Sequence, residues 1–241
     1  TMERSYADEV RENLMRVRET MAKACADAGR PENAVSLLAV TKTVEPARIN
    51  AAIALGVTGI GENRVQEFLG KRDELHLEGV AVHLIGHLQT NKVKYIVGKT
   101  CLVHSVDSLK LAAAISKEAV KHGCTVPVLI EVNVAGEESK FGVSPEETEA
   151  LVREASALPA LEIRGLMTIA PNVSDPEKNR PVFRRLKELS VDIAGKNINN
   201  VTMNVLSMGM TGDYQVAVEE GATIVRVGTG IFGQRAYSVQ D

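Results

Sequence analysis

The chain has 241 residues, a formal net charge of −3 at pH 7, 44% hydrophobic residues and 24% charged residues. This balance is ordinary for a globular protein and argues against a general nucleic-acid binder. No apolar run approaches the roughly 18 residues of a membrane span, and the start has no signal-peptide core. Three cysteines without a CxxC pair favour reduced thiols in a cytoplasmic protein over a disulfide framework or zinc site. Thr1 precedes Met2 and is expected to be foreign to the natural chain.

The chain begins with a predicted amphipathic helix over residues 5–28, which Gly29 ends. Eight short, apolar strands are then predicted, over residues 35–40, 58–61, 82–85, 102–105, 127–132, 162–167, 202–206 and 223–227. Each strand is followed by a helical pattern. Eight such units in this length predict a single α/β domain over residues 1–241, a (β/α)8 TIM barrel with an extra N-terminal helix. An open doubly wound sheet is the alternative, but it has fewer strands and carries its glycine loop after the first.

Helix-start and helix-stop residues support these units. Pro46 suits a first helical turn, and Ser144 begins a Ser-Pro-Glu-Glu capping box. Asp175 and Pro176 are predicted to open another helix, and Gly221 is predicted to end the last one.

Glycine-rich segments follow the last two predicted strands, where barrels often hold a phosphate group. They are Ser207-Met-Gly-Met-Thr-Gly-Asp213 and Gly228-Thr229-Gly230. The stretch 228–233 matches G-x-G-x-x-G, but too few residues follow it for the acidic residue of a dinucleotide site. The sequence therefore predicts a binding site for a single phosphate group. The alternative is a pair of glycine-rich turns without a ligand.

A lysine at the end of the first strand suggests a covalent site. Lys42 would stand at the barrel mouth, where partial burial frees an amine to attack a carbonyl, unless it is an ordinary surface lysine. An amine opposite a phosphate site fits pyridoxal 5′-phosphate (PLP), which carries both an aldehyde and a phosphate. Arg226 precedes the second glycine segment and would face the pyridine nitrogen or, alternatively, pair with a buried carboxylate.

The segments LLAVTKTVEPARINAAIALGVTGIGENRVQE, HLIGHLQTNKVKYI, VLIEVNVAGEESKFGV, IRGLMTIAP and LSMGMTGDYQVAVEEGATIVRVGTGIFGQR resemble the pyridoxal phosphate homeostasis protein family. The resemblance spans essentially the whole chain. It implies a fold similar to the N-terminal barrel of alanine racemase, without that enzyme's second, β-rich domain. It also implies that Lys42 holds PLP as a Schiff base, Asn63 lies beside the ring and Arg226 faces the ring nitrogen. The phosphate contacts that it implies are Ser207, Gly209, Gly228 and Thr229.

The family implies a PLP-binding protein of vitamin B6 homeostasis without established catalytic turnover. The alternatives are a low-activity PLP-dependent amino-acid racemase or decarboxylase, and a phosphate-binding barrel enzyme without PLP. A racemase needs a second base opposite Lys42, and Tyr214 is the tyrosine nearest a mouth loop. Expected partners are PLP and, transiently, apo forms of PLP-dependent enzymes, with no nucleic acid or membrane, and the protein is expected to be a monomer.

His87 is expected to line the mouth, whereas His83 is expected to be a structural or surface residue. No third histidine or carboxylate at metal-ligand spacing accompanies His83 and His87, so no metal site is expected. Lys140 follows the fifth strand on the same face as Lys42. It is either a mobile surface lysine or a second, transient amine that helps PLP to enter or leave.

Overall fold

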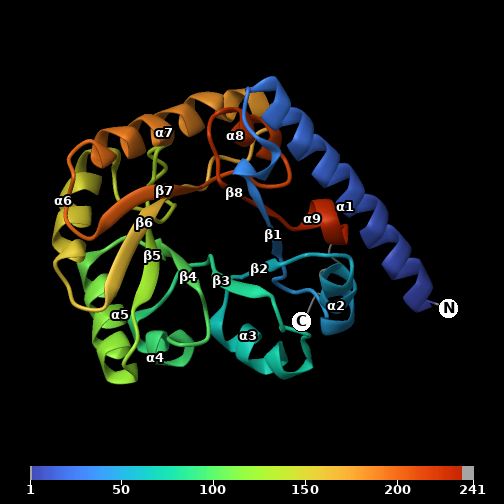
Figure 1. Cartoon of the computed structure of the whole chain (residues 1–241), viewed down its shortest axis with the longest axis horizontal. Coiled ribbons are helices and arrows are strands. Elements are labelled where there is room, and N and C mark those ends of the chain that lie inside the picture. The colour runs from blue at the N-terminus through green and yellow to red at the C-terminus, as the bar shows by residue number, and fades with distance from the viewer. Residues whose placement is uncertain (1, 235–241) are drawn as a thin grey trace.

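A computed structural model of the chain describes residues 2–234, in which eight parallel strands close into a barrel in chain order (Figure 1). The strands are β1 (Ser36–Val40), β2 (Gly59–Glu62), β3 (Ala81–Leu84), β4 (Leu102–Val106), β5 (Val126–Glu131), β6 (Leu161–Met167), β7 (Val201–Ser207) and β8 (Ile224–Val227). Each strand lies within one residue of its predicted bounds at either end. The predicted (β/α)8 barrel is confirmed, and the open-sheet alternative is wrong.

Helices surround the strands, as expected for β-then-α units (Figure 1). They are α1 (Met2–Asp27), α2 (Pro46–Ala54), α3 (Val65–Lys71), α4 (Val93–Ile96), α5 (Leu109–His122), α6 (Pro145–Ser156), α7 (Arg180–Ala194), α8 (Tyr214–Glu219) and α9 (Thr229–Phe232). Pro46 is the first residue of α2, and the Ser144 hydroxyl accepts a hydrogen bond from the Glu147 N–H at 3.3 Å. The predicted helix starts at Pro46 and Ser144 are therefore confirmed.

Two helix boundaries differ from the sequence prediction. Asp175 and Pro176 open a 3-10 turn, Pro176–Asn179, and α7 begins only at Arg180. Gly221 does end α8, but α8 is not the last helix, because residues 229–232 form the single turn α9. Ile231 and Phe232 are buried in the core, and their burial turns the chain back after β8.

The extra helix α1 lies against α2, α8 and α9 on one side of the barrel (Figure 1). Its buried face consists of residues at helical spacing, among them Val10, Leu14, Val17 and Met21. The Asn13 side chain donates to the Ile231 carbonyl at 2.9 Å, so α1 also holds α9 in place.

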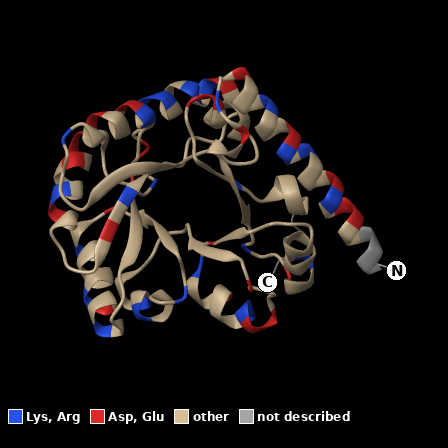
Figure 2. Cartoon of the chain, viewed as in Figure 1, with Lys and Arg blue, Asp and Glu red and all other residues tan. Residues whose placement is uncertain are grey.

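The apolar core has two parts, one between strands and helices and one inside the barrel. The interior part is formed by Leu38, Val40, Ile85, Leu102, Leu129, Met167 and Ile224. Charged residues of both signs lie mainly on the outer helices (Figure 2). None of the helices in the described residues is long and apolar enough to cross a membrane.

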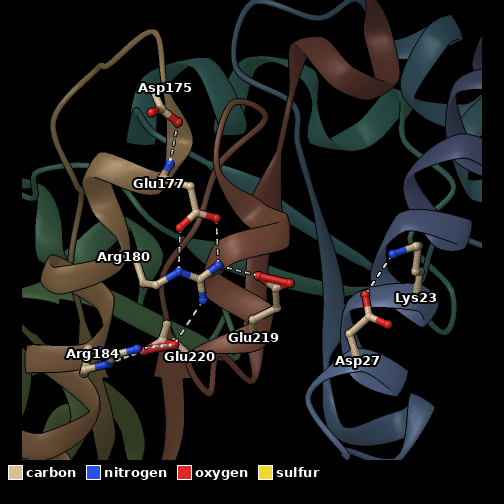
Figure 3. A network of polar contacts seen from close by, with 8 residues as sticks. All are labelled: Lys23, Asp27, Asp175, Glu177, Arg180, Arg184, Glu219 and Glu220. Atoms are coloured by element: carbon tan, nitrogen blue, oxygen red, sulfur yellow. Dashed lines mark hydrogen bonds and ion pairs between the residues drawn. The ribbon is translucent and has the colours of Figure 1, made fainter.

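An ion-pair network fastens α7 to α8 (Figure 3). Arg180 bonds Glu219 at 2.7 Å and Glu220 at 3.2 Å, and Arg184 bonds Glu220 at 2.6 Å. This network anchors the helix that directly follows the first glycine-rich segment.

Candidate functional site

The predicted site residues lie on four strands that are neighbours around the barrel, β7, β8, β1 and β2. Ala39 of β1 pairs with Val227 of β8, and Val40 pairs with Gly61 of β2. Lys42, Gly228 and Asn63 follow these paired residues by one to three positions. The strand register therefore brings their backbones to one sector of the C-terminal rim, the face on which barrel enzymes place their sites.

Inside the barrel, a polar layer lies directly above an apolar one. On four strands an apolar residue is followed, two positions nearer the rim, by a polar one: Leu102 by His104, Leu129 by Glu131, Val205 by Ser207 and Ile224 by Arg226. Residues two apart on a strand share a face, so each polar side chain enters the interior at the mouth end. The barrel interior thus has an apolar layer farther from the mouth and a polar layer nearer to it.

Arg226 is the fixed positive charge of this layer and is only 2% exposed. Its guanidinium donates to the Ser207 hydroxyl at 2.6 Å and to the Thr168 carbonyl at 2.9 Å. Burial lowers its pKa to about 10, although Glu131 and Asp213 act in the opposite direction. No carboxylate of the described residues forms an ion pair with it, so the alternative of a carboxylate-paired arginine is wrong.

A hydrogen-bond chain runs from Arg226 across the barrel. The Ser207 hydroxyl lies 2.9 Å from His104 Nδ1, and His104 Nε2 lies 2.9 Å from His83 Nδ1. A guanidinium can only donate, so Ser207 accepts from Arg226, and the tautomer of His104 sets the direction of the other two contacts. Burial of both imidazoles favours their neutral forms.

Burial lowers the pKa of His83 to about 4 and that of His104 well below its ordinary value. The unfolded chain therefore binds protons below about pH 6.5 that the folded chain resists. We expect the two histidines to lower the free energy of unfolding as the pH drops from about 6.5 to about 4, with His83 alone contributing on the order of 3 kcal/mol.

Urea denaturation between pH 4 and 7 tests this expectation on His83→Gln, which keeps a hydrogen-bonding group for His104. The variant should lose much of the pH slope, whereas His122→Gln, on the exposed surface of α5, should keep it. An unchanged slope in His83→Gln would contradict the assignment. Glu131 contributes with the opposite sign, because burial and Asp107 raise its pKa to about 7, but this contribution cancels between variant and parent.

The segment after β7 is held rigidly by its own polar groups. Asp213 accepts from the Met210 N–H at 2.7 Å and from the Asn179 side chain at 2.9 Å. Gly209 has φ of +99°, and a Cβ there would lie 2.6 Å from the Ala217 Cβ, so a side chain is excluded. The backbone near Gly209 is thereby kept open for a close approach.

The two glycine-rich segments touch each other. The Gly230 N–H donates to the Thr211 hydroxyl at 3.1 Å, which joins the segment after β7 to the one after β8. Ser207 and Arg226 meet below them. Two segments predicted separately therefore form one surface.

The remaining predicted residues lie outside the glycine-rich segments and the layer around Arg226. Lys42 is half-buried in the turn between β1 and α2, and Asn63 is half-buried after β2. Lys140 is exposed in the loop after β5. His87 is exposed and stacks on Phe141, with ring centroids 3.8 Å apart. Tyr214 packs against the core.

Sequence reasoning missed part of the layer around Arg226. It did not single out His104, Glu131 or Thr168. The signal was present, since a polar residue two positions after an inward apolar one marks the inner layer near the mouth. No group of acidic, histidine and cysteine side chains that could hold a metal occurs in the described residues.

The family model for the alanine racemase N-terminal domain matches residues 7–236, which include the whole barrel. A pyridoxal phosphate homeostasis protein of Aquifex aeolicus is 50% identical over 226 residues, covering 94% of this chain and 98% of the relative. One of Pseudomonas aeruginosa is 40% identical over 228 residues, covering 95% and 96%. The chain belongs to the pyridoxal phosphate homeostasis protein family.

A solved structure of PipY from Synechococcus elongatus, with PLP bound, has a TM-score of 0.78 to this chain. The two sequences are 34% identical, and the match covers 88% of this chain and 100% of PipY.

Proposed function

We propose that this chain binds PLP as a Schiff base on Lys42 and serves in intracellular PLP homeostasis as a carrier without catalytic turnover. The observation that carries the proposal is the convergence of strand ends on the rim. Lys42 follows β1 and Gly228 follows β8, and the two strands pair through Ala39 and Val227, while Arg226 is buried in β8. Family membership and the PLP in the PipY structure support it.

The residues present fit the chemistry of PLP. When bound, PLP supplies an aldehyde that a lysine amine traps with loss of water, and a ring that can accept electrons. Lys42 would provide the amine, and Asn63 would lie beside the ring. The open backbone at Gly209, the Ser207 hydroxyl and the start of α9 at Gly228 and Thr229 would hold the phosphate.

Arg226 accounts for the absence of turnover in this proposal. It is tied to Ser207 and Thr168, so its remaining N–H donors have a fixed direction. An arginine donates a hydrogen bond to a pyridine nitrogen but accepts no proton from it. A ring nitrogen held unprotonated withdraws electrons weakly, which suits storage better than carbanion chemistry.

Reduction with borohydride followed by peptide mapping tests the attachment point. The expected result is a PLP adduct on the peptide that contains Lys42. An adduct confined to another lysine would overturn the proposal. Incubation with amino acids in deuterated water separates the carrier from a racemase or decarboxylase, because enzyme-like exchange at Cα would favour the latter.

Lys140 is proposed to help PLP to leave. Its exposed amine, in the loop after β5, would take up the aldehyde transiently. Lys140→Ala should slow transfer of PLP to an apo-enzyme and leave the visible absorbance of the Lys42 Schiff base intact. Stopped-flow transfer kinetics measure this, and unchanged kinetics would remove the role.

We infer a single-domain cytoplasmic monomer that meets apo PLP-dependent enzymes only transiently. The described cysteines are free thiols, which supports a reducing compartment. Analytical ultracentrifugation with and without PLP tests the monomer.

A further inference from the structure

The turn that carries Lys42 has an unfavourable backbone conformation. Thr43, the next residue, has φ of +60°, in the left-handed region. Among the described non-glycine residues with positive φ it is the only β-branched one, the type that tolerates this region least. Such a conformation persists only where surrounding contacts determine it.

Contacts from α3 hold the turn on the C-terminal side of Lys42. The Thr43 N–H donates to Glu67 Oε2 at 2.8 Å. The same carboxylate oxygen accepts from the Lys71 ammonium at 2.6 Å. Glu67 and Lys71 are four residues apart on the helix, so they present both groups on one face.

The other side of Lys42 is held by the same ammonium. Lys71 donates to the Thr41 carbonyl at 2.7 Å and pairs with Glu62 Oε1 at 2.8 Å. The Thr41 hydroxyl donates to that Glu62 oxygen at 2.7 Å. The Lys71 side chain is 9% exposed and that of Glu62 is 1% exposed. These contacts are therefore shielded from water and little screened by salt.

We call Glu62, Glu67 and Lys71 the Lys71 cluster. An ammonium has three N–H donors, and here the Thr41 carbonyl and the two carboxylates use all three at short distances. A buried charge cluster adds little net stability compared with an apolar replacement. What it does supply is fixed geometry, at the two residues that flank Lys42.

We infer that the Lys71 cluster is a positioning device that fixes the backbone on both sides of Lys42 and so presents its amine to PLP. The inference rests on the proposed function. Glu67 and Lys71 act through Thr41 and Thr43 as positioning residues, and they are not catalytic residues.

Glu67→Ala and Glu67→Gln test the device as a pair. Alanine removes the acceptor for the Thr43 N–H, whereas glutamine keeps an acceptor oxygen in the same place. Glu67→Ala should speed hydrogen exchange of the Thr43 amide in PLP-free protein. It should also weaken PLP binding about tenfold, the loss expected for one charge-assisted hydrogen bond. Glu67→Gln should remain within about threefold of the parent.

A second substitution separates positioning from general damage. Glycine adopts positive φ without strain, so Thr43→Gly should remove part of the need for Glu67. The loss of PLP affinity caused by Glu67→Ala should therefore be smaller in the Thr43→Gly background. Equal losses in both backgrounds would overturn the inference.

Ile193→Ala is the control for stability. Ile193 is buried in α7, far along the chain from α3, and its truncation destabilises the core without touching the turn. PLP affinity that falls as much in Ile193→Ala as in Glu67→Ala would overturn the inference. The inference would also be overturned if Glu67→Ala left PLP affinity and Thr43 amide exchange unchanged while Lys42→Ala lost PLP. That result would leave the proposed function intact. Retention of the Schiff base in Lys42→Ala would overturn both.

Discussion

Lys42→Ala should abolish the visible absorbance of bound PLP and leave only weak, reversible binding through the phosphate. The reason is that the proposed Schiff base needs the amine of Lys42, which follows β1, and β1 pairs with β8. The fold should survive, because Lys42 is half-buried on the rim and outside both apolar clusters. Absorbance spectra and equilibrium dialysis of the purified variant measure the two effects.

Lys42→Arg is the matched control, because it keeps a positive charge on a long side chain but offers no amine. It should lose the visible absorbance as fully as alanine does. Retention of that absorbance in either variant would place the covalent attachment elsewhere. Lys140→Ala, which removes another lysine of the mouth, should keep it.

Arg226→Met should weaken PLP binding on the order of a hundredfold while changing the free energy of unfolding by no more than about 3 kcal/mol. Two opposing effects on stability partly cancel. The substitution removes hydrogen bonds to Ser207 and Thr168, which costs about 1.5–3 kcal/mol each for a charged donor. It also relieves the burial of a charge whose pKa is lowered to about 10, a gain of about 3 kcal/mol.

Arg184→Met provides the comparison for this arginine. Arg184 is exposed on α7 and pairs with Glu220, so its loss should cost little stability and leave PLP binding unchanged. PLP titration and urea denaturation of both variants test the difference. Unchanged PLP affinity in Arg226→Met would contradict the role of this residue.

Much of the fold could be predicted because barrel units repeat a simple pattern. Short apolar strands alternated with helices whose ends carried Pro46, Ser144 and Gly221, and these signals act locally. The short helix α9 was missed because four residues carry too little pattern. It forms where Ile231 and Phe232 reach the core, which is a tertiary effect.

The strand-end positions of the candidate site could be predicted, and the side-chain contacts between them less so. Lys42 and the glycine-rich segments stand at strand ends, which sequence reasoning can locate. The chain from Arg226 through Ser207 and His104 crosses from β8 and β7 to β4, and no local pattern encodes which interior side chains meet. The Lys71 cluster was missed for the same reason, since its partners come from β1, β2 and α3.

A crystal structure of the protein with PLP tests the central claim most directly. The account predicts continuous density from the Lys42 amine to a ring whose nitrogen faces Arg226, with the phosphate at the joined segments around Gly209 and Gly228. Density for PLP on another lysine, or a phosphate bound away from those segments, would contradict it.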